Sequence, residues 1–159
     1  MMKISKDEIK SAIGVFWGIG LVAAVAESID DNLLLAPFGA TSVIAFLTPE
    51  SKFAQPYNIV LGYTITSLVG LLVAYNLGHN WFTYALAVSL AMLVKVFFNA
   101  VHPPSAAMPI ILINAKSSNI LAYVFQDVIP GLLLLVAAAI IYNHFILHKD
   151  YPLWRRKHN

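Results

Sequence analysis

Residues 100–109 read AVHPPSAAMP and lie inside an apolar run, 81–113, that contains a single charged residue. As one helix this run would be about 50 Å long, against about 30 Å of hydrocarbon in a bilayer. Pro103 and Pro104 have no N–H to donate, and Pro104 disfavours the helical conformation of the residue before it. The sequence therefore predicts a helix that ends near Ala100 and a second, short helix that starts at Pro104.

The predicted second helix lacks a conventional N-cap. His102 and Pro103 stand where Ser, Thr, Asp or Asn would normally accept a hydrogen bond from the first turn. Lipid offers no partner for the free amides. Because a helix N-terminus carries partial positive charge and unpaired N–H groups, a bound anion is one candidate partner. The alternative is a kink whose amides are satisfied by water, by Ser105 or by a neighbouring helix.

Composition identifies an integral membrane protein. Of the 159 residues, 59% are hydrophobic and 11% are charged, whereas soluble domains have about 25% charged residues. The absence of cysteine excludes disulfides, thiolate zinc sites and redox thiols. No glycine-rich phosphate loop, nucleophile–base pair or metal-binding spacing is present, so we expect neither an enzyme nor a cofactor, and no nucleic-acid partner.

The apolar segments predict an all-α, polytopic membrane helix bundle. Four full transmembrane helices are expected over about 11–27, 57–78, 81–100 and 121–145, the last with a kink at Pro130-Gly131. Ser5 and Glu8 form a potential capping box that opens the first of them. Residues 33–47 (LLLAPFGATSVIAFL) would be only about 22 Å long as a helix. With Pro37 near its start, this segment and the one that starts at Pro104 are two short, proline-broken helices.

These segments suggest two repeats, about 11–78 and 81–147. A shift of 66 residues lays Pro37 on Pro103, and each half then reads span, proline-broken short segment, loop, span. Chance recurrence is the alternative, because few residues match. Short, interrupted hydrophobic segments at corresponding places in two halves are typical of secondary transporters. Residues 1–10 form an expected cytoplasmic N-terminal segment and 148–159 a basic cytoplasmic tail.

Lysine and arginine placement predicts the topology. Both termini are basic, which favours a cytoplasmic location for both and an even number of crossings. A bacterial inner (plasma) membrane is the expected location. If the short segments cross fully, there are six crossings and the halves are inverted; if they are re-entrant, there are four. For lysine placement the two topologies differ only in the side of the membrane on which Lys52 lies, so the sequence leaves the number of crossings open.

Polar residues near the two breaks form the candidate substrate site. Lys95, Asn99 and His102 would share one helix face before the break, and ionisable residues within a span usually face the protein interior. Alternatively, Lys95 snorkels to the interface and His102 only braces the backbone. Thr41 could donate to a ligand or to its own helix. The predicted substrate-binding set is Pro37, Phe38, Gly39, Ala40, Thr41, Lys95, Asn99, His102, Pro103, Pro104 and Ser105.

Three blocks of this sequence resemble the HPP family of integral membrane proteins. They are His102-Pro103-Pro104 followed by small residues, LLLAPFGATSVIAF at 33–46 and AQPYNIVLGYTITSLVG at 54–70. The resemblance covers about residues 11–147, and it implies nitrite as a substrate because characterised relatives are associated with nitrite transport. The family's motif positions carried over to this chain are Pro37, Phe38, Gly39, Gln55, Pro56, Asn58, His102, Pro103 and Pro104.

We therefore expect membrane transport of a small inorganic anion, bound where the two short helices begin. Gly39 and Ala106 would allow close approach to it. The alternative is a non-transporting membrane scaffold or subunit that binds partners through small-residue faces such as Gly14 and Gly18. An intramembrane enzyme is the third reading. A homo-oligomer is plausible, because four full spans would make a thin wall around a pore.

Overall fold

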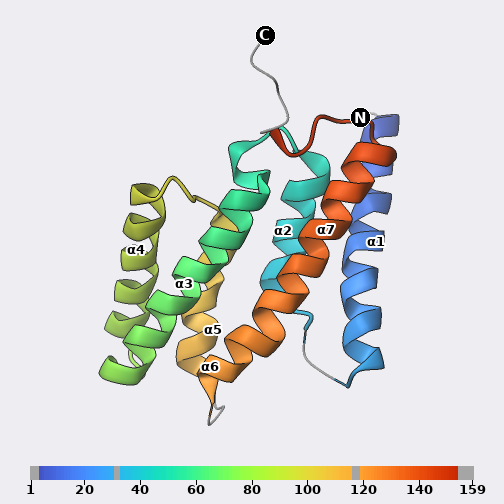
Figure 1. Ribbon diagram of the computed structural model, residues 1–159. Helices are drawn as coiled ribbons and strands as arrows, with labels where there is room; N and C mark the ends of the chain where they lie inside the picture. Colours follow the sequence, from blue (N-terminus) through green and yellow to red (C-terminus); the bar gives the residue numbers. More distant parts are fainter. Residues whose placement is uncertain (1–3, 31–32, 116–118, 154–159) are drawn as a thin grey trace.

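The computed structural model describes residues 4–30, 33–115 and 119–153, and every regular element within them is helical (Figure 1). The elements in chain order are α1 (Lys6–Ser28), α2 (Ala36–Leu47), the 3₁₀ turn η1 (Lys52–Ala54), α3 (Pro56–Leu77), α4 (Trp81–Phe97), the 3₁₀ turn η2 (Pro103–Ala107), α5 (Met108–Asn114), α6 (Ile120–Tyr123), the π turn η3 (Val124–Val128) and α7 (Ile129–Phe145). The all-α prediction is confirmed.

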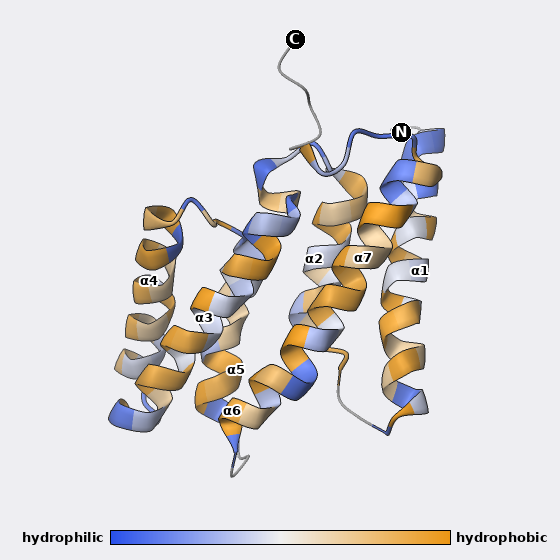
Figure 2. Cartoon of the chain, in the orientation of Figure 1, coloured by the Kyte–Doolittle hydropathy of each residue, from blue (hydrophilic) through white to orange (hydrophobic). Residues whose placement is uncertain are grey.

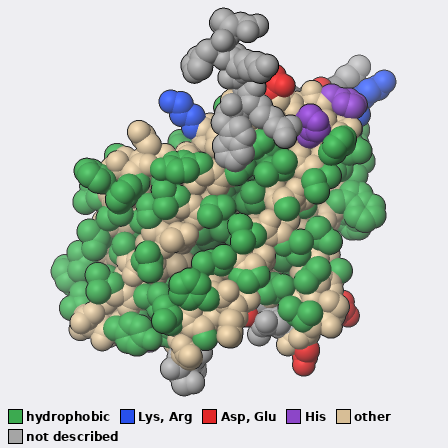
Figure 3. Space-filling view, in the orientation of Figure 1, with side chains coloured by type: hydrophobic (Ala, Val, Ile, Leu, Met, Phe, Trp, Pro, Cys, Tyr) green, Lys and Arg blue, Asp and Glu red, His purple; other side chains and the backbone are tan. Residues whose placement is uncertain are grey.

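Three helical stretches are long and apolar enough to cross a membrane: Lys6–Ser28, Pro56–Leu77 and Ile120–Phe145. Ala36–Leu47 and Trp81–Phe97 are shorter apolar helices. Hydrophilic residues concentrate toward the two ends of the bundle (Figure 2), and the face shown in Figure 3 carries its charged side chains at those ends, with an apolar band between them. This distribution is the one a bilayer imposes, so the chain is a multi-pass membrane protein.

The N-terminal capping box is present as predicted. The Ser5 amide donates to Glu8 Oε2 at 2.6 Å, and the Glu8 amide donates to Ser5 Oγ at 3.1 Å. Two of the free amides at the start of α1 are satisfied in this way.

The central break differs in detail from the prediction. Helix α4 ends at Phe97 rather than near Ala100, and η2 begins at Pro103 rather than Pro104. Between them the backbone is extended, with φ −131° and ψ 105° at His102. A 3₁₀ turn accommodates two successive prolines because its first positions need no N–H donor. The short helix is therefore a 3₁₀ turn continued by α5.

The segments that contain Pro37 and Pro130 also form helices, and the second departs from the expected shape. Pro37 lies in the first turn of α2, as predicted. In the last span the irregularity is not a kink at Pro130-Gly131 but the π turn η3 just before it. Pro130 has no N–H to donate to the carbonyl four residues earlier, and a wider turn precedes it. Asp127 is buried on this turn.

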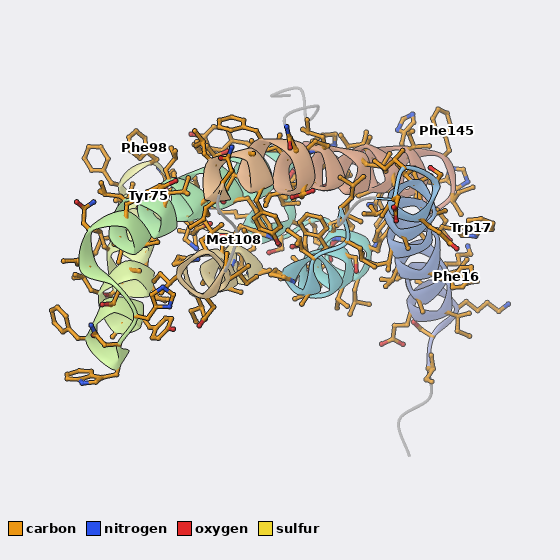
Figure 4. All side chains as sticks on the ribbon, turned by 90° about the horizontal axis from the view of Figure 1, so that it is seen from below. Phe16, Trp17, Tyr75, Phe98, Met108 and Phe145 are labelled. Atoms are coloured by element: carbon orange, nitrogen blue, oxygen red, sulfur yellow. The ribbon has the colours of Figure 1, made fainter. Side chains whose placement is uncertain are left out.

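The helices form two sets with the same pattern of neighbours. In this pattern α1 corresponds to α4, α2 to α5, and α7 to α3. Helix α1 packs on α2 and α7, while α4 packs on α5 and α3; α2 also contacts α7, and α5 contacts α3. Each helix runs opposite to its counterpart in Figure 1. Seen from below (Figure 4), α1 and α4 lie toward opposite edges of the bundle, Trp17 of α1 and Tyr75 of α3 point outward, and Met108 lies inside.

Two glycines allow the extended segments to enter the bundle. A Cβ on Gly62 of α3 would lie 3.0 Å from His102 Cβ and 3.1 Å from the Ala100 carbonyl oxygen. A Cβ on Gly131 of α7 would overlap the carbonyl oxygen of Leu33, which precedes α2. Each break is thus covered by a glycine on the long helix of the opposite half.

The small-residue pair in α1 is used inside the molecule. A Cβ on Gly14 would lie 2.6 Å from Phe46 and 2.8 Å from Tyr142, and one on Gly18 would lie 2.7 Å from Phe46. These glycines therefore let α1 pack against α2 and α7. Bulky replacements there would therefore disturb the fold itself, whether the protein is a scaffold or a transporter.

Candidate functional site

Side chains from both halves meet where the two broken segments come together. Thr41, in the first half of α2, has its Oγ1 atom 2.9 Å from His102 Nε2 and 2.8 Å from the hydroxyl of Tyr63 on α3. All three side chains are buried. The Tyr63 ring also lies against the His102 ring, with centroids 5.6 Å apart. We call Thr41, Tyr63, Lys95, His102 and Ser105 the polar centre.

The hydrogen bonds of His102 assign its tautomer. Nδ1 lies 2.7 Å from the carbonyl oxygen of Phe53, which can only accept, so Nδ1 carries a proton. In the neutral ring Nε2 then accepts from the Thr41 hydroxyl, which also lies 3.1 Å from the Pro37 carbonyl of its own helix, and Thr41 Oγ1 accepts from Tyr63. Both ring nitrogens are satisfied, and the imidazole connects η1 with α2.

Lys95 does not snorkel, because its side chain is only 3% exposed. Its Nζ donates to the His102 carbonyl at 3.2 Å and to Ser105 Oγ at 3.1 Å. Ser105 Oγ in turn donates to the same carbonyl at 2.8 Å. The ammonium therefore braces the broken backbone. Within residues 4–30, 33–115 and 119–153 no carboxylate lies within 4.0 Å of it.

The expectation of open amides at the second break is wrong. The first two residues of η2 are prolines without N–H groups, and the amide of the third, Ser105, donates to the His102 carbonyl at 3.3 Å. At the first break the Phe38 amide already donates to the Leu35 carbonyl at 2.9 Å. A ligand at this place would therefore be bound by side chains rather than by helix ends.

The remaining predicted residues divide into two groups. Pro37 and Phe38 are buried beside the centre, with the Phe38 ring edge-on to Tyr63 at 5.6 Å, and Pro104 is half-buried in η2. Gly39, Ala40, Asn99 and Pro103 are exposed. Asn99 does not share a helix face with Lys95, because α4 has already ended and Asn99 has a φ of 53°.

Three groups of the site were missed by sequence reasoning. They are Tyr63, the Phe53 carbonyl and Tyr151. The motif positions Gln55 and Asn58 did indicate that the loop before α3 belongs to the site. The Asn58 side-chain amide donates to the Val101 carbonyl at 3.3 Å, and Gln55 Nε2 donates to the Ser51 carbonyl at 2.9 Å. No linear pattern marked Tyr63 or Tyr151.

The chain after α7 folds back on this loop rather than extending as a tail. Tyr151 is fully buried, and its hydroxyl donates to the Ala54 carbonyl at 2.6 Å. The Leu153 amide donates to Gln55 Oε1 at 2.9 Å. Adjacent carbonyls, Phe53 and Ala54, thus accept from His102 and Tyr151. The predicted tail is ordered up to residue 153, and residues 154–159 lie outside the described part.

Replacing Tyr151 by phenylalanine should remove this brace and lower the free energy of unfolding by about 1 kcal/mol. Burial raises the pKa of the Tyr151 phenol above its ordinary value of 10.0. The neutral form is therefore favoured in the folded protein: its contribution is complete below pH 10 and is lost as the pH rises through the folded pKa. Thermal unfolding in detergent at pH 7 and pH 10.5 checks this.

The outcome that would contradict this account is an equal alkaline loss of stability in Tyr151→Phe and in the wild type. A matched control is Tyr75→Phe, because Tyr75 is exposed on the outer face of α3. It should unfold as the wild type does at both pH values.

Among the described residues, no three His, Asp or Glu side chains are grouped so that they could hold a metal ion.

Comparison with known proteins places the chain among membrane proteins. A sequence model described as "HPP, transmembrane region" matches residues 3–152. One transmembrane protein of Dictyostelium discoideum is 30% identical over 149 residues, covering 87% of this chain and 52% of the relative. A second from the same organism is 33% identical over 127 residues, covering 76% and 41%. The chain thus spans about half or less of these relatives. No solved structure matches it.

Proposed function

Because this chain belongs to the HPP family of transmembrane proteins, we propose that it moves a small inorganic anion, nitrite by family resemblance, across a lipid bilayer. The observation that supports this most is the contact between Thr41 and His102. It joins the two halves inside an apolar bundle, at the place where both membrane segments are interrupted. Interrupted helices around a central polar site are the arrangement found in secondary transporters.

Side-chain donors would bind the anion in this scheme. In the present arrangement the Thr41 hydroxyl, the Tyr63 hydroxyl and His102 satisfy one another. If the halves separate, the Thr41 hydroxyl loses His102 and the Nδ1–H of His102 loses the Phe53 carbonyl, so an anion can accept from both donors. Lys95 holds the backbone of His102 and adds positive charge beside it. Buried donors without partners are costly, which favours their occupation by a ligand.

Alternating access follows from the pseudo-symmetric packing. We propose that the halves 11–78 and 81–147 are inverted repeats, with four full spans and two short proline-started crossings. Rocking of one half against the other would break the hydrogen bonds that join them at the centre, Thr41–His102 and His102–Phe53. The glycine contacts at residues 62 and 131 keep the two breaks packed against long helices.

The orientation we propose places both termini in the cytoplasm of a bacterial cell. In the described part of the chain, exposed lysines such as Lys6, Lys10 and Lys52 lie at the end where α1 begins and α7 ends, whereas Glu27 and Asp30 lie at the opposite end. Cytoplasmic faces carry the excess of lysine and arginine. This proposal is checked by labelling single cysteines introduced at positions 6 and 79 from the outside of intact cells.

Uptake by purified protein in liposomes tests transport directly. Wild-type protein should take up nitrite, and His102→Ala should reduce the rate about tenfold to a hundredfold, since a hydrogen bond to a charged group contributes about 1.5–3 kcal/mol. Asn99→Ala is the matched control, because Asn99 is exposed outside the polar centre. The proposal fails if wild-type liposomes take up no nitrite, nitrate, formate or chloride, or if His102→Ala transports normally.

A further inference from the structure

A groove runs between α4 and the segment formed by η2 and α5. Its volume is about 850 Å³, and its walls are almost entirely apolar, with Ala85, Val88 and Met92 on one side and Ala106 and Ile110 on the other. Trp81 lies at one end of it and Lys95 toward the other. Along α4 these two residues are about 21 Å apart. That length exceeds one leaflet of hydrocarbon, about 15 Å, so the groove is long enough for an acyl chain.

Lys95 gives this apolar groove one cationic wall residue. Its ammonium has three N–H donors, and its two acceptors, the His102 carbonyl and Ser105 Oγ, carry no formal charge. No carboxylate of the described residues neutralises it. A buried charge without a counter-charge is costly. The structure therefore leaves one N–H donor of Lys95 for an anion that the groove can admit.

We propose that the groove binds one anionic phospholipid, with the phosphate on Lys95 and an acyl chain against the walls of α4 and α5. Lys95 lies in the last turn of α4, in the half of the bundle nearer the chain termini (Figure 1). An inorganic anion alone would leave the apolar walls uncovered. The lipid site does not depend on which ion is transported.

Lipid binding to delipidated protein in detergent tests the proposal. Native mass spectrometry would compare phosphatidylglycerol, which has a net negative charge, with zwitterionic phosphatidylcholine of the same acyl chains. We expect one phosphatidylglycerol per chain, bound at least about tenfold more tightly than phosphatidylcholine. Inorganic phosphate at the same concentration should neither compete nor stabilise, which separates a lipid site from a simple phosphate site.

Three variants locate the site. Lys95→Met should stay folded and lose the preference for phosphatidylglycerol, whereas Lys52→Met, which replaces an exposed lysine outside the groove, should keep it. Ala106→Trp should fill the groove and weaken the binding of both lipids about tenfold. This variant provides the test if Lys95→Met does not fold. Equal affinity of the wild type for both lipids, an unchanged preference in Lys95→Met, or undiminished binding in Ala106→Trp would each overturn the proposal.

Discussion

Replacing Gly131 by alanine is expected to destabilise the protein by about 2–3 kcal/mol, an effect of the size seen when a packed core is overfilled. The added Cβ would overlap the carbonyl oxygen of Leu33 and lie 2.9 Å from the Phe38 ring. A backbone oxygen cannot move aside as a flexible side chain can. Either α7 or the extended segment before α2 must therefore shift, and the packing of Phe38 against Tyr63 would shift with it.

Gly20→Ala is the matched control for this change. Gly20 also lies within a helix, but a Cβ there would have no atom within 4 Å. Helix propensity alone favours alanine over glycine by about 1 kcal/mol, so Gly20→Ala should be neutral or slightly stabilising. Reversible unfolding in mixed detergent–SDS micelles measures both. Equal stability of Gly131→Ala and Gly20→Ala would show that α7 does not touch the entry to α2.

Thr41→Val should have the second large effect, a loss of about 2–4 kcal/mol. The substitution keeps the shape of the side chain and removes the hydroxyl that bridges His102 and Tyr63. Two buried polar atoms then lack partners, at about 1–3 kcal/mol each. Thr64→Val is the control: the Thr64 hydroxyl donates only to the Val60 carbonyl of its own helix at 2.9 Å, so we expect a change below about 1 kcal/mol.

The double variant Thr41→Val/Tyr63→Phe separates lost hydrogen bonds from altered packing. It removes one of the two orphaned groups, so its loss of stability should be smaller than the sum of the single losses. Strict additivity of the two substitutions would mean that Thr41 and Tyr63 do not share a hydrogen bond. The measurement is again the free energy of unfolding in mixed micelles, with retained helix content checked by circular dichroism.

Much of the fold follows from local chemistry. The capping box at Ser5 and Glu8, the helix start at Pro37 and the interruption at Pro103-Pro104 are decided by which backbone groups can donate within a few residues. The hydrophobic lengths that mark a membrane protein are equally local. Helix α4 ends three residues before the predicted position, because alanine and valine at 100–101 do not by themselves signal an ending.

The candidate site could be predicted only in part. Thr41, Lys95, His102 and Ser105 do come together, whereas Asn99 turns away on a positive φ after the helix has ended. The sequence did not predict the buried roles of Tyr63 and Tyr151, because a tyrosine in an apolar helix or a polar tail is typical of an interface anchor. Their partners lie on other elements, which a periodic pattern along one helix cannot identify.

By itself the sequence determined that this chain is a helical membrane protein whose second and fifth helices are shortened by proline, since chain length in lipid and the missing proline N–H act within a few residues. Only the tertiary structure decided where the polar groups are satisfied. His102 bonds to Thr41 across 61 positions and to Phe53 across 49. Hydrogen bonds in a dry interior go to whichever partners packing brings near, and here packing brings the His102 imidazole to two other elements.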